Sequence, residues 1–238
     1  MRRYSGLLLL ALCLPGHAHW NNVSLETGDG LSLKASYISP ARKGPAMLLL
    51  HQCNQDRSSW SAIGKQLHDA GVHVLALDLR GFGDSDGEGL LGADGFAGFL
   101  ARSQSDVDQA FDYLVSQDLV DKTRVGVGGA SCGAMLSAEL AIRRDVRALM
   151  LLSGPPSDAA VANIEASPDL AVFAAAATED AVTPGVHALL QRTVAMSPHP
   201  KSTAKIFSGS EHGTPLFGRH EELEPALMAW LLQALDNP

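Results

Sequence analysis

The sequence predicts a single α/β domain, in which helices flank a mostly parallel central sheet that begins with an antiparallel hairpin. Two alternating runs, residues 23–27 and 31–38, surround Gly28-Asp29-Gly30, and this pattern is typical of a hairpin. From residue 46 onward, short continuous apolar runs alternate with longer segments of helical periodicity. Continuous apolar runs indicate strands covered on both faces, and their alternation with helices indicates parallel pairing.

The parallel part of the sheet is expected to hold six strands, at residues 46–50, 72–77, 124–128, 146–152, 170–177 and 204–207. The helices are expected at residues 60–70, 99–119, 132–143, 186–194 and 223–235. Residues 84–95 and 153–168 are expected to be loops, with a single helical turn in the second. Ligands of such sheets bind at the carboxyl ends of the strands, so we expect the catalytic or binding residues there.

The first 18 residues have the pattern of a secretory signal peptide. Arg2 and Arg3 precede an apolar run at residues 7–14, and small residues lead to an expected cleavage after Ala18. Residues 19–238 would then form one domain of a secreted or periplasmic protein. The apolar run is too short for a mature membrane helix, and no second stretch is long enough, so we expect no stable membrane span.

Composition restricts the partners of the protein. Hydrophobic residues make up 46% and charged residues 18%, which is ordinary for a globular protein. The net charge of −8 and the lack of a basic stripe disfavour nucleic acid and anionic membrane surfaces. Cys13 lies in the signal, where Leu12 fits lipoprotein processing poorly. Cys53 and Cys132 would remain in an oxidising compartment, which permits them to pair.

The stretch Gly129-Ala130-Ser131-Cys132-Gly133 matches the Gly-x-Ser-x-Gly pattern of a nucleophile elbow. It follows an expected strand and opens an expected helix, which is the context that the pattern requires. In such a turn the serine is strained and its hydroxyl projects above the sheet, and glycines two residues away avoid crowding. The alternative is a glycine-rich turn that packs closely and has no catalytic role.

A serine nucleophile needs a base and an orienting acid, each placed just past a strand and in the order serine, acid, histidine. Asp180 follows the expected strand at 170–177, and it could instead cap the helix that begins near Pro184. Asp158 and Glu179 are rival acids. His212 follows the last expected strand and is the candidate base. The other candidates fall on or beside helices, namely His187, His199 and His220.

The oxyanion of the reaction needs two N–H donors. The N–H of Cys132 follows the serine, and the loop after the strand at 46–50 supplies that of Cys53. Because the two donors must converge, the cysteines could lie within disulfide distance and form a Cys53–Cys132 bridge. The alternative is two buried thiols that point apart. His51 is expected to be structural, and we expect neither a metal nor an organic cofactor.

These motifs resemble the α/β-hydrolase superfamily. The resemblance rests on the elbow, the loop at residues 51–54, Asp78-x-Arg80-Gly81-x-Gly83-x-Ser85, Asp180 and His212-Gly213, which follow the family's order. Because few residues separate Leu152 from Leu170, the chain looks capless, similar to the dienelactone-hydrolase-like and small carboxylesterase branches. The resemblance implies an α/β-hydrolase fold and hydrolysis of a small-molecule ester.

Two residues depart from these branches. Dienelactone hydrolases use a cysteine nucleophile where this chain has Ser131, and a frame with Cys132 as nucleophile would place Ala130 and Ala134 where glycines belong. Gln52 stands where many lipases have glycine and dienelactone hydrolases have glutamate. Residues expected to line the substrate pocket, or else to lie in the core, are Gln52, Trp60, Phe82, Phe96, Leu216 and Phe217.

The sequence therefore favours a serine hydrolase that cleaves carboxylic esters. Ser131 would attack, His212 would relay the proton, and Asp180 would orient His212. A peptidase or amidase with the same triad and a non-catalytic binding module on the same fold are the alternatives. The oligomeric state does not follow from the sequence.

Overall fold

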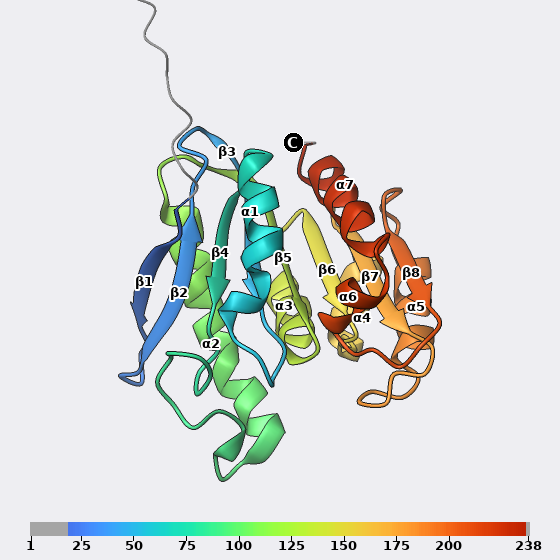
Figure 1. Cartoon of the computed structure of the whole chain (residues 1–238), viewed down its shortest axis with the longest axis horizontal. Helices are drawn as coiled ribbons and strands as arrows, with labels where there is room; N and C mark the ends of the chain where they lie inside the picture. The colour runs from blue at the N-terminus through green and yellow to red at the C-terminus, as the bar shows by residue number, and fades with distance from the viewer. Residues whose placement is uncertain (1–18, 237–238) are drawn as a thin grey trace, which may run out of the picture.

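A computed structural model describes residues 19–236, so the expected signal peptide lies outside the described residues. An eight-stranded sheet runs through the described chain in the order β1-β2-β4-β3-β5-β6-β7-β8 (Figure 1). The strands are β1 (Asn21–Glu26), β2 (Ser32–Ile38), β3 (Gly44–Leu50), β4 (His73–Leu77), β5 (Val120–Ala130), β6 (Ala148–Leu152), β7 (Ala171–Ala177) and β8 (Thr203–Phe207). The predicted α/β-hydrolase fold is confirmed, including the antiparallel N-terminal hairpin of β1 and β2.

Seven α-helices in the described part of the chain pack on this sheet: α1 (Ser61–Asp69), α2 (Gly95–Ser116), α3 (Cys132–Arg143), α4 (Asp158–Ala166), α5 (Val186–Met196), α6 (Pro215–Arg219) and α7 (Leu223–Leu235). Two short 3-10 helices, η1 (Arg57–Trp60) and η2 (Gly89–Leu91), lie in loops. Within residues 19–236, no helix has the length and apolar character needed to cross a membrane.

The strand order makes the connections diverge at the end of β3. β3 pairs with β4 on one side and with β5 on the other, both in parallel, so the connections leaving β3 and β4 run in opposite directions across the sheet. In open α/β sheets the loops diverge at such a point, and ligands bind where they separate. β2 is antiparallel to β4, whereas all later pairs are parallel.

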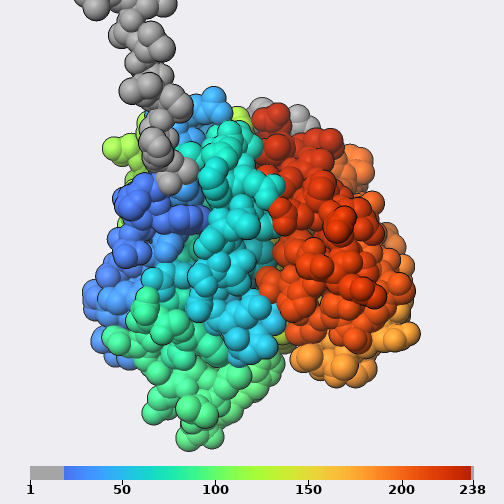
Figure 2. Space-filling model, in the orientation of Figure 1, coloured from blue at the N-terminus to red at the C-terminus, as the bar shows by residue number. Residues whose placement is uncertain are grey.

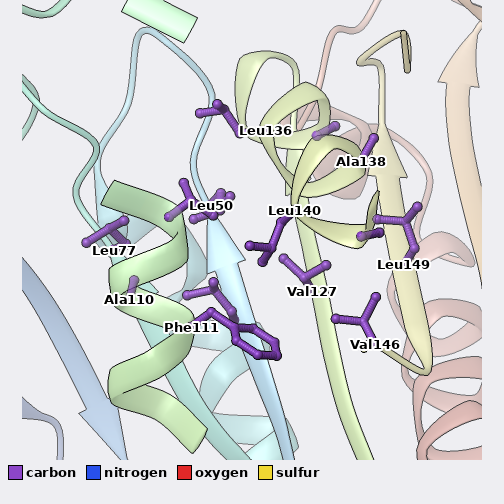
Figure 3. Packing of buried hydrophobic residues seen from close by; sticks show 14 of the residues in the cluster. Leu50, Leu77, Ala110, Phe111, Val127, Leu136, Ala138, Leu140, Val146 and Leu149 are labelled. Atoms are coloured by element: carbon purple, nitrogen blue, oxygen red, sulfur yellow. The ribbon is translucent and has the colours of Figure 1, made fainter. Parts of the chain in front are cut away.

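The core lies in two layers, one on each face of the sheet. Leu48 and Leu50 of β3 point into the layer under α2, α3, α4 and α5, whereas Met47 and Leu49 point into the layer under α1 and α7. Figure 3 shows part of the first layer. Figure 2 shows α1 and α7 side by side over the second, where Gln66 donates a hydrogen bond to Glu224. The apolar run of β3 is continuous because both of its faces are covered.

Two helices are absent from the sequence prediction. α4 spans nine residues within a stretch expected to be a loop with a single turn. Only Ala160 and Ile164 of this helix are buried, so its apolar periodicity is sparse, and the Ser157 hydroxyl caps it by accepting a hydrogen bond from Ala160 N (3.1 Å). α6 is five residues long and begins at Pro215, a residue suited to the first turn of a helix.

The segment from Asp78 to Ser85 has a structural role. The Asp78 carboxylate accepts hydrogen bonds from the backbone N–H of Arg57 (2.7 Å) and of Asp84 (2.9 Å), and it also pairs with the Arg57 guanidinium. Arg80 makes two bonds of 2.6 Å to the fully buried Asp106, whose carboxylate raises the pKa of Arg80 above its ordinary value. These bonds join the loop after β4 to η1 and to α2.

Candidate active site

Ser131 occupies a strained turn between β5 and α3. Its backbone has φ 52° and ψ −120°, a conformation that a residue with a side chain rarely adopts. The turn is held by hydrogen bonds from Ser131 N to Leu152 O (2.8 Å) and from Met135 N to Ser131 O (3.1 Å). Such strain persists only where the surrounding structure enforces it, and it concentrates at functional sites.

The glycines around Ser131 are required by close backbone contacts. A Cβ on Gly129 would lie 2.5 Å from the carbonyl oxygen of Leu50, and a Cβ on Gly133 would lie 2.5 Å from that of His51. The end of β3 therefore presses directly on the elbow. A Cβ on Gly154, after β6, would likewise collide with the carbonyl oxygen of Ser131, so loops from both neighbouring strands fix the turn.

Asp180 and His212 form a hydrogen-bonded pair above the ends of β7 and β8. His212 Nδ1 lies 2.8 Å and 3.0 Å from the two Asp180 oxygens. The carboxylate is fully buried and also accepts hydrogen bonds from Val182 N (3.0 Å) and Thr183 N (2.9 Å). Because a carboxylate only accepts, Nδ1 carries a proton, so in the neutral ring Nε2 is the nitrogen with the lone pair.

The Nε2 atom of His212 is buried and has no hydrogen-bond partner within the described chain. The structure therefore shows no hydrogen bond between His212 Nε2 and the Ser131 hydroxyl. In unliganded active sites this bond is often long, and it tightens when substrate binds. The rival acids lie elsewhere: Asp158 is exposed at the start of α4, and Glu179 is exposed beside Asp180.

The other histidines considered from the sequence have different surroundings. His187 lies on α5, and His199 accepts a hydrogen bond from Lys201 N (3.1 Å) in the turn after that helix. His220 ends α6 and stacks on Phe207, with ring centroids 4.2 Å apart. Among the described residues, His212 alone pairs with an aspartate from the end of a neighbouring parallel strand.

The two residues expected to supply the oxyanion donors lie next to each other. Cys53 and Cys132 are joined by a disulfide, and their Cα atoms are 5.9 Å apart. Neither N–H donates a hydrogen bond within residues 19–236. Cys132 is the first residue of α3, a helix of 12 residues whose N-terminus carries partial positive charge. Both N–H groups are therefore free to stabilise a developing oxyanion.

Gln52 ties the loop after β3 to the loop that carries His212. Its Oε1 accepts a hydrogen bond from Thr214 N (2.9 Å), and its Nε2 donates to Asn54 Oδ1 (2.7 Å). Gly213 between His212 and Thr214 has φ 70°, and a Cβ there would collide with Oε1 of Gln52. Gln52 is only 4% exposed, so the structure places it beneath the site rather than on an open pocket wall.

His51 is structural, as expected. Its Nδ1 lies 2.8 Å from Gln52 O, and its Nε2 accepts a hydrogen bond from Leu79 N (3.0 Å). Both contacts are satisfied only by a neutral ring with the proton on Nδ1. Burial lowers the pKa of His51 below its ordinary value and so favours this neutral form.

The expected pocket walls are corrected in part. Trp60 and Leu216 have no exposed surface and lie in the core layer under α1 and α7, so neither lines an open pocket. Phe217 is partly buried against Trp60, with ring centroids 6.4 Å apart. Phe82 packs against His51 (5.3 Å between centroids) and against Phe99. Phe96 is 47% exposed on α2.

The sequence reasoning did not find the contact between Gln52 and Thr214, because nothing in the sequence links residues so far apart. It also missed an apolar cleft of about 520 Å³ between α2, α3 and the loop after β6. One signal was available: Met135 follows Ser131 by four residues, so the two lie on one face of the helix. Residues 19–236 contain no group of three His, Cys, Asp or Glu side chains arranged to hold a metal ion.

Comparisons with known proteins agree with this fold. A family model described as alpha/beta hydrolase fold matches residues 45–226. An uncharacterised protein of Mycobacterium tuberculosis is 33% identical over 134 residues, which are 56% of this chain and 44% of that protein. The acyltransferase drtE of Aspergillus calidoustus is 30% identical over 139 residues, 58% of this chain and 43% of that protein. The chain thus spans less than half the length of these curated relatives.

The solved structure of the Pyrococcus furiosus esterase PF2001 superposes with a TM-score of 0.73 and 15% identity, covering 95% of this chain and 96% of that one. At this identity the likeness shows the fold. The family model covers most of the sheet, the elbow and both loops that carry Asp180 and His212. The chain belongs to the α/β-hydrolase family.

Proposed function

We propose that this hydrolase cleaves carboxylic esters through a Ser131-His212-Asp180 triad, as a serine member of the dienelactone-hydrolase-like and small carboxylesterase branches. The observation that carries the proposal is the hydrogen bond between buried Asp180 and His212 Nδ1, beside a buried Nε2 that has no partner in the described chain. A histidine held in this tautomer is a general base for a nearby hydroxyl.

In the proposed reaction the Ser131 hydroxyl attacks the ester carbonyl carbon and transfers its proton to His212 Nε2. The carbonyl oxygen becomes an oxyanion, which the N–H groups of Cys53 and Cys132 stabilise. The C–O bond to the alcohol then breaks, and Nε2 returns the proton to the departing alcohol. Water, deprotonated by His212, then attacks the acyl carbon. The bond from that carbon to Ser131 Oγ breaks, Nε2 returns the proton to Oγ, and the acid is released. Asp180 stabilises the imidazolium in both steps.

We also propose that the protein acts outside the cytoplasm, after removal of residues 1–18. The basic start and short apolar run of that segment support export. The close approach of Cys53 and Cys132 is compatible with an oxidising compartment. The acyl acceptor is water in this proposal, whereas the Aspergillus calidoustus relative is named as an acyltransferase.

A fluorophosphonate probe tests the nucleophile. The wild type should become labelled, and Ser131→Ala should abolish labelling and lower ester hydrolysis at least about 10³-fold. Ser105→Ala is the matched control, because Ser105 is exposed on α2 and lies outside the site. An unlabelled wild type would favour a binding module. Comparison of a p-nitrophenyl ester with a peptide p-nitroanilide tests the reaction class, and faster anilide cleavage would assign a peptidase or amidase.

A further inference from the structure

The apolar cleft lies on the α2–α3 face of the sheet and has no part in the triad. Its volume is about 520 Å³, within the range of sites for small molecules. The apolar side chains that line it are Leu100 of α2, Met135 and Leu136 of α3, and Pro155 and Pro156 of the loop after β6. A lining of this kind suits a hydrocarbon chain rather than a polar group.

The cleft follows the face of α3 that starts at the nucleophile, with Met135 and Glu139 in its lining. Ser131, Met135 and Glu139 are spaced four residues apart, so they follow one face of α3. Gly154 lies against the carbonyl of Ser131, and the next residue, Pro155, already lines the cleft. At 1.5 Å per residue, the eight residues from Ser131 to Glu139 give a path of about 12 Å along the helix.

The outer end of this path is polar. Ser157 donates a hydrogen bond to Glu139 Oε1 (2.5 Å), which joins the β6 loop to α3. The Glu139 carboxylate disfavours a ligand that ends in a second carboxylate, because like charges repel. The chain that fits is therefore neutral and of limited length.

The two faces of the sheet separate the two halves of an ester. The alcohol must leave close to His212 Nε2, which protonates it. His212 is followed by α6, which packs through Leu216 into the core layer shared with α1 and α7. The cleft lies on the opposite face, in the layer of Leu136 and Phe99. An acyl chain bound to Ser131 would therefore extend along α3, away from the leaving alcohol.

A second apolar surface continues from the cleft. Phe96 lies one helical turn before Leu100 on α2 and is 47% exposed. Leu91 of η2, close by in the chain, is 93% exposed. Figure 1 shows the first turns of α2 projecting beyond the strand ends where the elbow lies. The exposed Phe96 on this part of α2 adds apolar surface one turn from Leu100 of the cleft.

We propose that the cleft between α2, α3 and the β6 loop binds the acyl chain of the ester, and that the preferred acyl group is unbranched, neutral and of medium length, roughly six to ten carbons for a path of about 12 Å. This inference rests on the proposed ester hydrolysis. Leu100 and Met135 act as specificity residues. Each methylene buried in the cleft adds to the binding of the transition state, by roughly fourfold in kcat/KM.

A series of p-nitrophenyl esters tests the chain length while the alcohol stays constant. We expect kcat/KM to rise from acetate to octanoate by roughly fourfold per methylene and to fall again by palmitate. A parallel series of alkyl acetates, in which only the alcohol grows, should show less than about a threefold change from ethyl to octyl. A flat acyl series, or a steep alcohol series, overturns the assignment of the cleft to the acyl group.

Filling the cleft tests its location. Leu100→Trp should lower the ratio of octanoate to acetate kcat/KM at least about tenfold, and Gln104→Trp, at the solvent side of the cleft, should lower it in the same direction. Ile142→Trp is the matched control, because Ile142 is exposed on α3 outside the cleft, and its ratio should equal that of the wild type. An unchanged ratio in both cleft variants overturns the inference. If the fluorophosphonate labels the protein but kcat/KM does not change along the acyl series, only the assignment of the cleft is wrong and the proposed ester hydrolysis stands. If the protein is neither labelled nor able to hydrolyse any ester, both proposals are wrong.

Discussion

Removal of the bridge between Cys53 and Cys132 should destabilise the protein and slow the reaction together. The bridged residues are 79 positions apart, so reduction frees a long loop in the unfolded chain. The chain-entropy model gives a loss of about 4 kcal/mol for a loop of this length. For a domain of this size such a loss corresponds to a fall in Tm of roughly 8–16 °C. The bridged residues also carry both expected oxyanion donors, so kcat should fall about tenfold to hundredfold.

The assay is urea unfolding of the wild type, of Cys53→Ala, of Cys132→Ala and of the double variant. If the bridge is the source of the effect, each single variant should lose nearly as much stability as the double variant, because either change removes the same bond. Wild type treated with dithiothreitol should match them. Two free thiols in denatured, unreduced protein, or a double variant within about 1 kcal/mol of the wild type, would refute the reasoning.

Three further substitutions test other contacts. Asp106→Ala leaves the Arg80 guanidinium buried without its bidentate partner, so urea unfolding should show that the free energy of unfolding falls by about 3–5 kcal/mol. The double variant Arg80→Met, Asp106→Leu should recover most of this loss. Gln52→Leu removes the acceptor of Thr214 N, and steady-state kinetics should show that kcat falls by a larger factor than KM rises. Gln52→Glu should retain most of the rate, because it keeps an acceptor oxygen at this position. Burial lowers the pKa of His51 below its unfolded value of about 6.5, so the folded protein binds fewer protons at this residue than the unfolded chain. The contribution of His51 to the free energy of unfolding is therefore present above that pH and is lost below it, by up to about 1.4 kcal/mol per pH unit. Unfolding curves of His51→Gln between pH 7.5 and pH 5 should show a shallower loss than the wild type, and equal slopes would contradict this.

The strands of the sheet, their mostly parallel pairing and the candidate site residues could be predicted because each depends on local patterns. Strands covered on both faces are continuous apolar runs, and residues directly after parallel strands meet at one edge. Asp180 and His212 each satisfy that rule, and the structure brings them within 2.8 Å. Ser131 was recognisable because the elbow constrains five consecutive residues, and two of them must be glycine.

Other features depend on contacts that no local pattern encodes. Gln52 and Thr214 are 162 positions apart, and any polar side chain in either loop could have made the contact. α4 was missed because a helix rich in alanine that buries only two side chains has almost no apolar stripe. Trp60 could be assigned from the sequence either to the pocket or to the core, and the structure places its ring in the core against Phe217.

The glycines of the elbow and the neighbouring cysteines belong to one geometric feature. Both glycines face the end of β3: Gly129 meets the carbonyl of Leu50, and Gly133 meets that of His51. Without a Cβ at either position, the loop after β3 can approach the first turn of α3 closely. That approach is what brings Cys53 within 5.9 Å of Cys132, measured between Cα atoms. The glycine spacing therefore does more than expose a serine, because it also sets how close the two cysteines lie, whose N–H groups act on one oxygen in the proposed mechanism.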